Sequence, residues 1–324
     1  LITKSFPPFR GGISNYLFSL FSPLSKKFPV TVSTNSPSEL NDSCDYSSFV
    51  KIYRSKYSID KGLFFRFPFY LNSLLCFLKN RNAFTDVFAE SVFPSGAMCF
   101  LMKLINAKIK FHVFTYGSEL FVDKQWFKIL RNLVLKKADN IISISSFTQS
   151  RVKEISGRDS IMISPGYDKA FYASRIHSPS DEFVILTVAK LTERKGHLLA
   201  LEALGALKNK INFKYVIIGK GEYEEKIRKH AEIHGISSQT VIITDADNER
   251  LFEAYRKASV FLMPTIRLKS DVEGFGIVYL EAGAHKVPVI ATNNGGVADI
   301  VKDGLNGIIV KENNVEEIIN ALIL

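Results

Sequence analysis

The sequence predicts an α/β protein made of two Rossmann-like, doubly wound domains that face a cleft. In both halves of the chain, short segments rich in Val, Ile and Phe alternate with helix-forming segments, a pattern typical of parallel sheets flanked by helices. Glycine-rich turns follow several of the predicted strands. The length of 324 residues allows each half to bury a core of its own. We therefore expect the ligand site in the cleft between the two domains.

The first domain is predicted over residues 1–172. Leu1–Thr3 reads as the end of a strand, and a loop over Pro7–Gly12 leads into a helix at Ile13. Its other strands are predicted at 29–34, 86–89, 110–115, 140–144 and 161–164. Its helices are predicted at 13–22, 68–79, 94–105 and 125–138, with one more starting at Ser145. The Ser- and Asn-rich residues 36–48 are predicted as an exposed loop.

A hinge is predicted at residues 173–182, which show no periodicity, and a second domain at 183–324. Its strands are predicted at 183–189, 213–218, 241–243, 260–263, 288–291 and 307–310. Its helices are predicted at 197–207, after Gly221, at 249–258 and at 277–285.

The charge is unevenly distributed between the halves. Residues 1–175 hold 24 Lys and Arg against 12 Asp and Glu, a net of +12. The remainder holds 42 − 24 = 18 basic and 32 − 12 = 20 acidic residues, a net of −2. A basic first half attracts anionic partners, but the charge alone does not choose among nucleic acid, lipid headgroups and small anions.

Aromatic residues lie among basic ones in the segment from Lys56 to Arg81. This composition fits a segment that lies on a membrane surface. It fits somewhat better a connecting helix whose aromatic side chains pack on the sheet. A platform for single-stranded nucleic acid is the third reading, and no RNA-binding motif accompanies it. No apolar run reaches the ~18 residues needed to span a bilayer. The three cysteines lack metal-ligand spacing and favour a reducing compartment.

The segment Glu273–Glu281 carries the chemistry expected of a nucleotide-sugar site. Gly274 and Gly276 precede a predicted helix, and glycines there let the backbone and the first-turn N–H groups approach a phosphate. Two carboxylates, Glu273 and Glu281, can accept hydrogen bonds from hydroxyl groups. Taken alone, such a segment is more often a plain helix with a glycine-rich start and a solvated glutamate.

Other polar residues follow the predicted strands of the first domain. Gly12, the segment Tyr116–Glu119 and the segment Pro165–Asp168 each come directly after a strand or its loop. Since the carboxyl ends of parallel strands share one edge of a sheet, we expect these residues along one rim. The Gly11-Gly12 pair is not a GxGxxG fingerprint, so a dinucleotide-binding motif is not supported.

Five segments together resemble retaining glycosyltransferases of the GT-B fold, family 4. The longest is Glu273–Val310, EGFGIVYLEAGAHKVPVIATNNGGVADIVKDGLNGIIV. The others, in the family's order along the chain, are Pro7–Gly12, Ala138-Asp139, Val188–Gly196 and Ile217–Glu222. The resemblance implies two facing Rossmann-like domains, of which the second binds the nucleotide-sugar donor. It also implies a final helix that crosses back to the first domain, and we expect that helix to be missing here.

The resemblance also implies roles for individual residues. Glu281 corresponds to the ligand of the ribose hydroxyls, and Glu273 to the contact with the transferred sugar. Lys190 and Lys195 correspond to the basic pair that contacts the diphosphate. Together with Glu273, these two lysines form the implied catalytic set. The other implied donor contacts are the residues Gly12, Gly219, Gly274, Phe275 and Gly276.

The acceptor side departs from the family pattern. Many members carry His near the strand end at Thr115, where this chain has Tyr116 followed by Ser118 and Glu119. We assign these three residues to the acceptor side. His112 lies inside the predicted strand, where a histidine is more often a satisfied core residue than a catalytic substitute.

The resulting prediction is an enzyme that transfers a hexosyl unit from a UDP- or GDP-sugar to an acceptor hydroxyl, without a metal or other cofactor. The acceptor is predicted to be lipid-linked or an oligosaccharide, and the protein cytoplasmic and peripheral on the inner membrane face. Rival readings are a GT-B epimerase or phosphorylase, and an inactive, transferase-like binding subunit.

Overall fold

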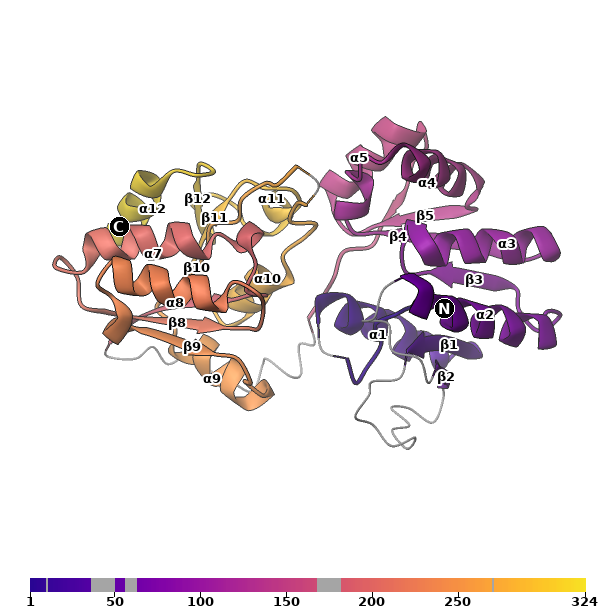
Figure 1. The fold of residues 1–324 in the computed structure, drawn as a ribbon, viewed down its shortest axis with the longest axis horizontal. Helices are drawn as coiled ribbons and strands as arrows, with labels where there is room; N and C mark the ends of the chain where they lie inside the picture. The colour runs from indigo at the N-terminus through magenta and orange to yellow at the C-terminus, as the bar shows by residue number, and fades with distance from the viewer. Residues whose placement is uncertain (10, 36–49, 56–62, 168–181, 270) are drawn as a thin grey trace. The chain divides into compact units, whose positions relative to one another are not determined.

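The computed structural model describes residues 1–9, 11–35, 50–55, 63–167, 182–269 and 271–324. It divides into two compact units, Leu1–Gly166 and Tyr167–Leu324 (Figure 1). The predicted loop at 36–48 and almost all of the predicted hinge at 173–182 lie outside the described residues. So do Lys56 and Lys61, together with Asp168.

Unit 1 contains a parallel sheet. Ile2 bridges Ser33 on one side and Ala89 on the other, and so joins the pair β1–β2 to the four-stranded run β3–β4–β5–β6. The strands are β1 (Val30–Asn35), β2 (Val50–Ser55), β3 (Asp86–Ala89), β4 (Lys110–Thr115), β5 (Asn140–Ser143) and β6 (Ile161–Met162). The predicted alternation is confirmed, except that β2 was not predicted and β6 is shorter than expected.

The helices of unit 1 cover both faces of this sheet. They are α1 (Gly12–Ser25), α2 (Leu63–Lys79), α3 (Ala97–Ile105), α4 (Gln125–Lys137) and α5 (Ser146–Ser156), with a π-helical turn at Val92–Gly96 before α3. The inner side chains of α2, α3, α4 and α5 share one core with alternate residues of β4, such as Phe111 and Val113. The other β4 residues face α1, where Phe114 packs edge-on against Tyr16 at 5.9 Å.

The sequence explains where α5 begins and ends. Ser145 caps its first turn by accepting the N–H of Thr148, and the Thr148 hydroxyl accepts the N–H of Ser145 in return. This reciprocal pair is a capping box in which Thr replaces the usual Glu. Gly157 then ends the helix in the left-handed conformation, with φ of 72°.

Unit 2 contains one parallel sheet of order β12-β11-β10-β7-β8-β9. Its strands are β7 (Phe183–Val188), β8 (Phe213–Ile218), β9 (Thr240–Ile243), β10 (Val260–Met263), β11 (Val289–Thr292) and β12 (Gly307–Val310). In chain order this is the 3-2-1-4-5-6 arrangement of a Rossmann domain, read from the opposite edge. The predicted doubly wound sheet is therefore confirmed.

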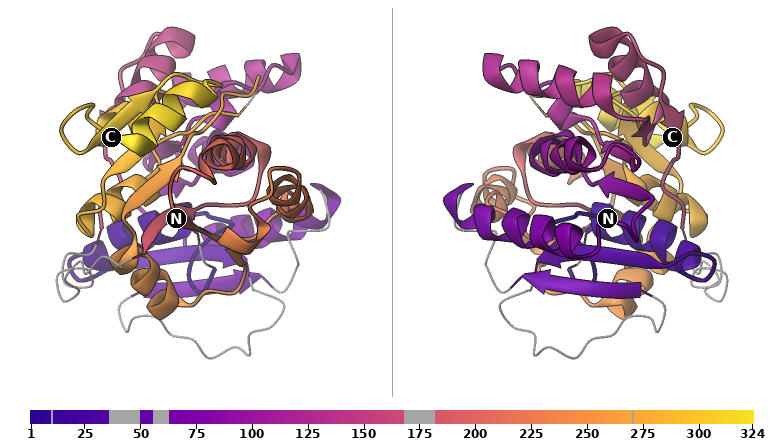
Figure 2. Two further views of the ribbon diagram at one scale, coloured as in Figure 1. Left: turned by 90° about the vertical axis from the view of Figure 1, so that its left-hand side faces the viewer. Right: turned by 90° about the vertical axis from the view of Figure 1, so that its right-hand side faces the viewer.

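The helices of unit 2 form a layer on each face of its sheet (Figures 1 and 2). One core joins the sheet to α7 (His197–Leu207), α8 (Glu224–Ile233) and α12 (Val315–Ile323). A second core joins the opposite face to α9 (Asn248–Lys257), α10 (Ile277–Ala284) and α11 (Val297–Ile300). The four-residue α11 was not predicted.

Candidate functional site

The strand order of unit 2 reverses between β7 and β10, which lie side by side. Ligands of doubly wound sheets bind outside the carboxyl ends of the strands at such a reversal. The loops that leave β7 and β10 meet there, because the N–H of Ile266 donates to the carbonyl of Arg194 over 2.8 Å. Most of the predicted site residues of unit 2 lie on these two loops or directly after them.

Glycines allow these loops to pack backbone against backbone. Gly196 has φ of +70°, and a Cβ there would lie 1.9 Å from the carbonyl oxygen of Pro264. Gly295, after β11, has φ of +65°, and its Cβ would lie 1.9 Å from the carbonyl oxygen of Glu273. The N–H of Gly296 donates to that same carbonyl over 2.8 Å. No side chain larger than hydrogen fits at either glycine without moving a loop.

Two cations hold the carboxylate of Glu273. The Nζ of Lys195 and the Nη1 of Arg194 each donate to its Oε2 over 2.6 Å. Arg194 also donates through Nε to Oδ2 of Asp271 over 3.0 Å. The side chains of Glu273, Lys195 and Arg194 are only 8%, 11% and 16% exposed. The three charges therefore interact in a partly dehydrated environment, where screening by solvent is weak.

The surroundings of Glu273 keep it ionised. Burial by itself would raise the pKa of this carboxyl, but the charges of Lys195 and Arg194 and their hydrogen bonds outweigh burial and lower the pKa below its usual value. Burial would likewise lower the pKa of Arg194, and the charges of Glu273 and Asp271 raise it instead. At neutral pH the cluster thus holds one buried carboxylate against two cations.

The segment after Glu273 forms the start of α10. Gly276 caps the helix in the left-handed conformation with φ of 88°, and Phe275 before it is buried. The first turn of a helix leaves N–H groups without intrahelical partners, and they lie next to Gly274 and Gly276. The expected glycine-led approach to a helix N-terminus is therefore present.

Glu281 lies in the second turn of α10 and is half-buried. Its Oε2 accepts a hydrogen bond from the hydroxyl of Tyr255 over 2.8 Å. Tyr255 is fully buried and stacks on His285 at 5.1 Å. A side chain on α9 thus fixes the direction of this carboxylate.

Lys190 and Gly219 lie at the carboxyl ends of β7 and β8. Lys190 is exposed and forms no ion pair with any residue that the structure describes. Its carbonyl accepts the N–H of Thr192 over 2.9 Å and lies 3.3 Å from Nε2 of His197. Gly219 has φ of +155°, and a Cβ there would lie 1.8 Å from the carbonyl oxygen of Ala189. Close packing between these two loops requires this glycine.

In unit 1, the predicted acceptor residues lie at the carboxyl edge of its sheet. Gly12 is the first residue of α1 and is exposed. The N–H of Tyr116 donates to Oε1 of Glu119 over 2.6 Å. Burial raises the pKa of the Glu119 carboxyl above its usual value, although hydrogen bonds from backbone N–H groups, including that of Tyr116, act to lower it. Ser118 is half-buried beside them.

The hydroxyl of Tyr116 is buried and has no hydrogen-bond partner among the described residues. Its ring packs edge-on against Tyr16 at 6.2 Å and stacks on Phe114 at 6.4 Å. Burial, followed by the nearby charge of Glu90, raises its pKa well above the usual value. The Tyr116 hydroxyl is therefore turned toward the core and stays protonated and neutral at neutral pH.

His112 is satisfied within the sheet, as predicted. Its Nε2 lies 2.8 Å from Oδ1 of Asp86, and its Nδ1 lies 3.1 Å from Nδ2 of Asn140. Because the Asn140 amide is a donor, Nδ1 accepts and Nε2 carries the proton. Asp86 and Asn140 are the first residues of β3 and β5, so this cluster does not lie at the carboxyl edge.

Sequence reasoning missed three side chains that contact or neighbour the predicted ones. They are Arg194 on Glu273, Tyr255 on Glu281, and Glu90, which accepts hydrogen bonds from Thr3 Oγ1 over 2.7 Å and from the Lys4 N–H over 2.5 Å. Only Arg194 carried a signal, since it belongs to the basic loop Lys190–Gly196. A buried tyrosine and a glutamate after a strand are common features of α/β cores.

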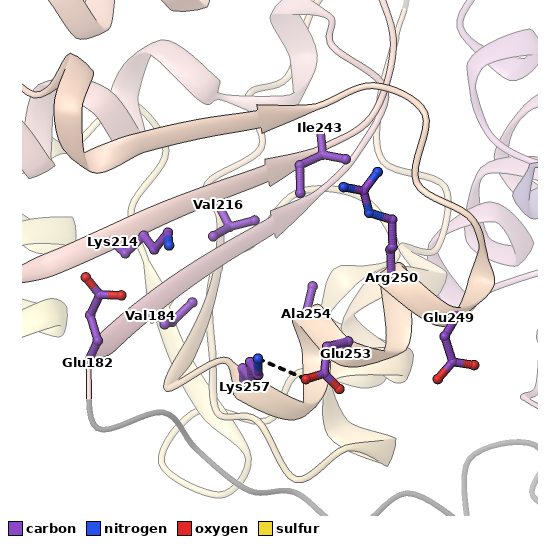
Figure 3. A pocket seen from close by; sticks show the side chains of 10 residues that line it. All are labelled: Glu182, Val184, Lys214, Val216, Ile243, Glu249, Arg250, Glu253, Ala254 and Lys257. Atoms are coloured by element: carbon purple, nitrogen blue, oxygen red, sulfur yellow. Dashed lines mark ion pairs between the residues drawn. The ribbon is translucent and has the colours of Figure 1, made fainter.

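Unit 2 also has an open hollow of about 470 Å³ between its sheet and α9 (Figure 3). Its floor includes Val184, Val216 and Ile243, and none of the predicted site residues lines it. Three acidic and three basic side chains surround it: Glu182, Glu249, Glu253, Lys214, Arg250 and Lys257. With balanced charges, it offers no net attraction for an anionic nucleotide.

The residues that the structure describes contain no group of three or more His, Cys, Asp or Glu side chains arranged to hold a metal ion. No helix that they form is both long enough and apolar enough to cross a bilayer.

Comparison with known proteins shows a consistent similarity to glycosyltransferases. Residues 168–324 match the glycosyl transferases group 1. A GDP-mannose-dependent α-(1-6)-phosphatidylinositol monomannoside mannosyltransferase from Mycolicibacterium smegmatis is 28% identical over 99% of this chain and 87% of its own length. The chain is a glycosyltransferase, and its second half is similar to the group 1 family.

Solved structures show the same fold for this glycosyltransferase. Sucrose-phosphate synthase from Thermosynechococcus elongatus superposes with a TM-score of 0.84 over 99% of this chain and 87% of its own, at 17% identity. Anabaena HepE in complex with UDP-glucose superposes with a TM-score of 0.76 over 98% and 86%, at 16% identity. The fold is GT-B, with a parallel sheet in each of two domains.

Proposed function

We propose that this glycosyltransferase is a retaining enzyme that moves a hexosyl unit from a UDP- or GDP-sugar to an acceptor hydroxyl. The observation that carries the proposal is the cluster of Arg194, Lys195 and Glu273 at the strand reversal of unit 2. It combines fixed cations with a carboxylate that stays ionised. A sugar attached to a diphosphate needs both kinds of group.

Glu281 is proposed to bind the ribose of the donor. A carboxylate accepts hydrogen bonds from two neighbouring hydroxyl groups at once. The Tyr255 hydroxyl donates to one of its oxygens over 2.8 Å and so fixes the direction of the carboxylate. This role does not depend on the acceptor, nor on which sugar is transferred.

The diphosphate is proposed to lie against Lys190, Lys195 and the start of α10. As the bond to the sugar breaks, negative charge grows on the leaving phosphate, and positive charge grows on the anomeric carbon. Fixed cations and helix N–H groups stabilise the leaving group without reorganising. Gly219 would let the backbone approach the phosphates closely. We therefore expect the reaction to need neither a metal nor an organic cofactor.

Glu273 is proposed to face the transferred sugar together with Gly274 and Phe275. Its pairing with Lys195 couples the two halves of the site, since the same ammonium group would contact both the carboxylate and a phosphate. The acceptor would attack from the face that the diphosphate leaves, and the phosphate would help to remove its proton. This step keeps the anomeric configuration.

The acceptor is proposed to be a lipid-linked sugar or an oligosaccharide in polysaccharide or glycolipid synthesis. The mannosyltransferase relative, whose name specifies a phosphatidylinositol glycolipid, supports a lipid-linked acceptor. Tyr116, Ser118 and Glu119 are proposed to border its site. Because the Tyr116 hydroxyl is buried and neutral, Tyr116 would shape the site and would not act as a base.

Thermal unfolding against a panel of nucleotide sugars tests the proposal. A ligand stabilises the protein by RT ln(1 + [L]/Kd), about 2.7 kcal/mol at one hundred times Kd. GDP-mannose is the first donor to try. We expect one donor to raise Tm in the wild type and to lose this effect in Glu281→Ala, with Glu253→Ala on the surface of α9 as the control. A panel without any stabilising donor would contradict the proposal.

A further inference from the structure

The outer surface of α4 carries large apolar side chains that face solvent. Trp126, Ile129 and Leu133 follow one another at helical spacing and are 53%, 63% and 39% exposed. The opposite side of the same helix is buried through Phe127, Val134 and Leu135. These three exposed side chains therefore form a stripe that points away from the sheet.

The neighbouring helices α2 and α3 repeat this feature. The helices α2, α3 and α4 lie side by side in this order and share one core beneath them, so their outer sides belong to one face of unit 1 (Figures 1 and 2). On α2 the exposed apolar residues are Leu71, Leu75 and Leu78, and on α3 they are Leu101, Leu104 and Ile105.

This outer face of α2, α3 and α4 concentrates exposed apolar area. Of the eighteen large apolar side chains that are exposed in the described parts of the chain, nine lie on these three helices. Single exposed apolar residues need no explanation, but a contiguous set marks an interaction site. Such a face is suited to an interaction.

The charges on the same helices select the class of partner. The 17, 9 and 13 residues of α2, α3 and α4 include no Asp or Glu. Lys79, Lys136 and Lys137 are exposed at the ends of α2 and α4, and none of them is paired within the described residues. Lys103 and Lys128 are paired, with Asp139 and Asp123. Apolar stripes with unpaired lysines at their ends match an anionic lipid surface.

We propose that the outer face of α2, α3 and α4 docks on an anionic membrane surface. The apolar side chains enter the boundary between headgroups and acyl chains, and Lys79, Lys136 and Lys137 contact the headgroups. Each helix is short and lies along the surface. This proposal names the part of the protein that would bring it to a lipid-linked acceptor, and in that sense it rests on the proposed function. The docking itself needs neither donor nor acceptor.

The chain contains a single tryptophan, Trp126, so its fluorescence reports on this face alone. Wild-type protein is mixed with vesicles of phosphatidylcholine, with or without phosphatidylglycerol, in the absence of nucleotide sugars. We expect a blue shift and co-sedimentation with the anionic vesicles, both reduced by high salt. No shift and no co-sedimentation with either vesicle overturns the proposal, and leaves donor binding to be judged separately.

Surface variants locate the docking face without touching the core. The double variant Leu104→Ser/Ile129→Ser removes two of the most exposed apolar side chains, and we expect it to weaken vesicle binding about tenfold or more. We expect Lys136→Glu/Lys137→Glu to remove most of the salt-sensitive binding. The matched controls on α8 of unit 2, Ile233→Ser and Lys229→Glu, are expected to bind like the wild type.

Two outcomes would overturn the assignment to lipid. One is vesicle binding that the face variants leave unchanged, which would place docking elsewhere on the protein. The other is a blue shift of Trp126 fluorescence that increases with protein concentration in the absence of vesicles, together with a doubled mass in light scattering. That result would make this face an interface between two copies of the chain.

Discussion

The guanidinium of Arg194 lies 2.6 Å from the carboxylate of Glu273, 79 positions further along the chain. Arg194 spans two carboxylates, since its Nε also donates to Asp271. Its backbone carbonyl accepts the N–H of Ile266. One residue therefore ties the loop after β7 to the loop after β10 and holds Glu273 in position between them.

Replacing Arg194 by Gln is expected to raise the pKa of Glu273, because one of its two cations is removed. The low-pH limb of donor hydrolysis should then move to higher pH. Leaving a buried charge with fewer partners should also cost about 3 kcal/mol of stability. The pH profile of nucleoside diphosphate release measures the first effect, and urea unfolding measures the second.

The control variant Arg256→Gln removes an exposed ion pair with Glu253 and should change neither the pH profile nor the stability. An unshifted profile in Arg194→Gln would rule out this role.

The Tyr255 hydroxyl is expected to matter for nucleotide affinity. Without it, Glu281 loses the donor that directs its carboxylate, and we expect affinity for the donor's nucleoside diphosphate to fall about three- to tenfold, roughly 1 kcal/mol. Titration calorimetry on Tyr255→Phe measures this. Tyr215→Phe is the matched control, because Tyr215 is also fully buried and bonds Thr187 over 2.9 Å. Equal affinity in both variants would argue against the assignment of Glu281.

Gly196 is expected to tolerate no side chain. Its Cβ would lie 1.9 Å from the Pro264 carbonyl oxygen, so Gly196→Ala must separate the loops as well as strain φ. Gly304 has nearly the same φ, +72°, with nothing within 4 Å of its Cβ. Gly304→Ala should cost only the conformational strain, about 1 kcal/mol. Urea unfolding should show a loss several-fold larger for Gly196→Ala. Equal losses would mean that the loops are not held as closely as described.

His197 is expected to make stability depend on pH. It is 1% exposed, and burial lowers its pKa to about 4. In the unfolded chain the His197 imidazole has a pKa of about 6.5, so between pH 6.5 and 4 the unfolded state binds more protons than the folded state. The free energy of unfolding should therefore fall by about 3 kcal/mol as the pH drops from about 6.5 to 4. Unfolding of the wild type and His197→Gln over this range measures the difference. Parallel curves for the two proteins would contradict it.

The sequence predicted most of the fold because both sheets are regular and parallel. Strand β2 was missed because Val50–Ser55 has only six residues, shows no regular alternation and pairs only with β1. Such a short edge strand does not stand out from the polar residues around it. Helix α11, with four residues, is too short for any helical period to appear.

The site was predicted where its residues lie close together in the sequence. Glu273, the glycines after it and Glu281 were found by their spacing on one helix and its approach. Arg194 was missed because the loop contains two adjacent basic residues, and only the folded chain shows that both reach the same carboxylate. Tyr255 was missed because a tyrosine inside a core helix carries no sign that its hydroxyl supports a site residue on another helix.

Release of nucleoside diphosphate from a bound donor tests the central claim most directly. The stabilising donor is incubated with wild type, Glu273→Gln and the control Glu253→Gln, and the diphosphate is quantified over time. We predict slow release by the wild type and the control, and none by Glu273→Gln, with donor binding retained in all three. Undiminished release by Glu273→Gln would contradict the claim that Glu273 lies at the reacting sugar.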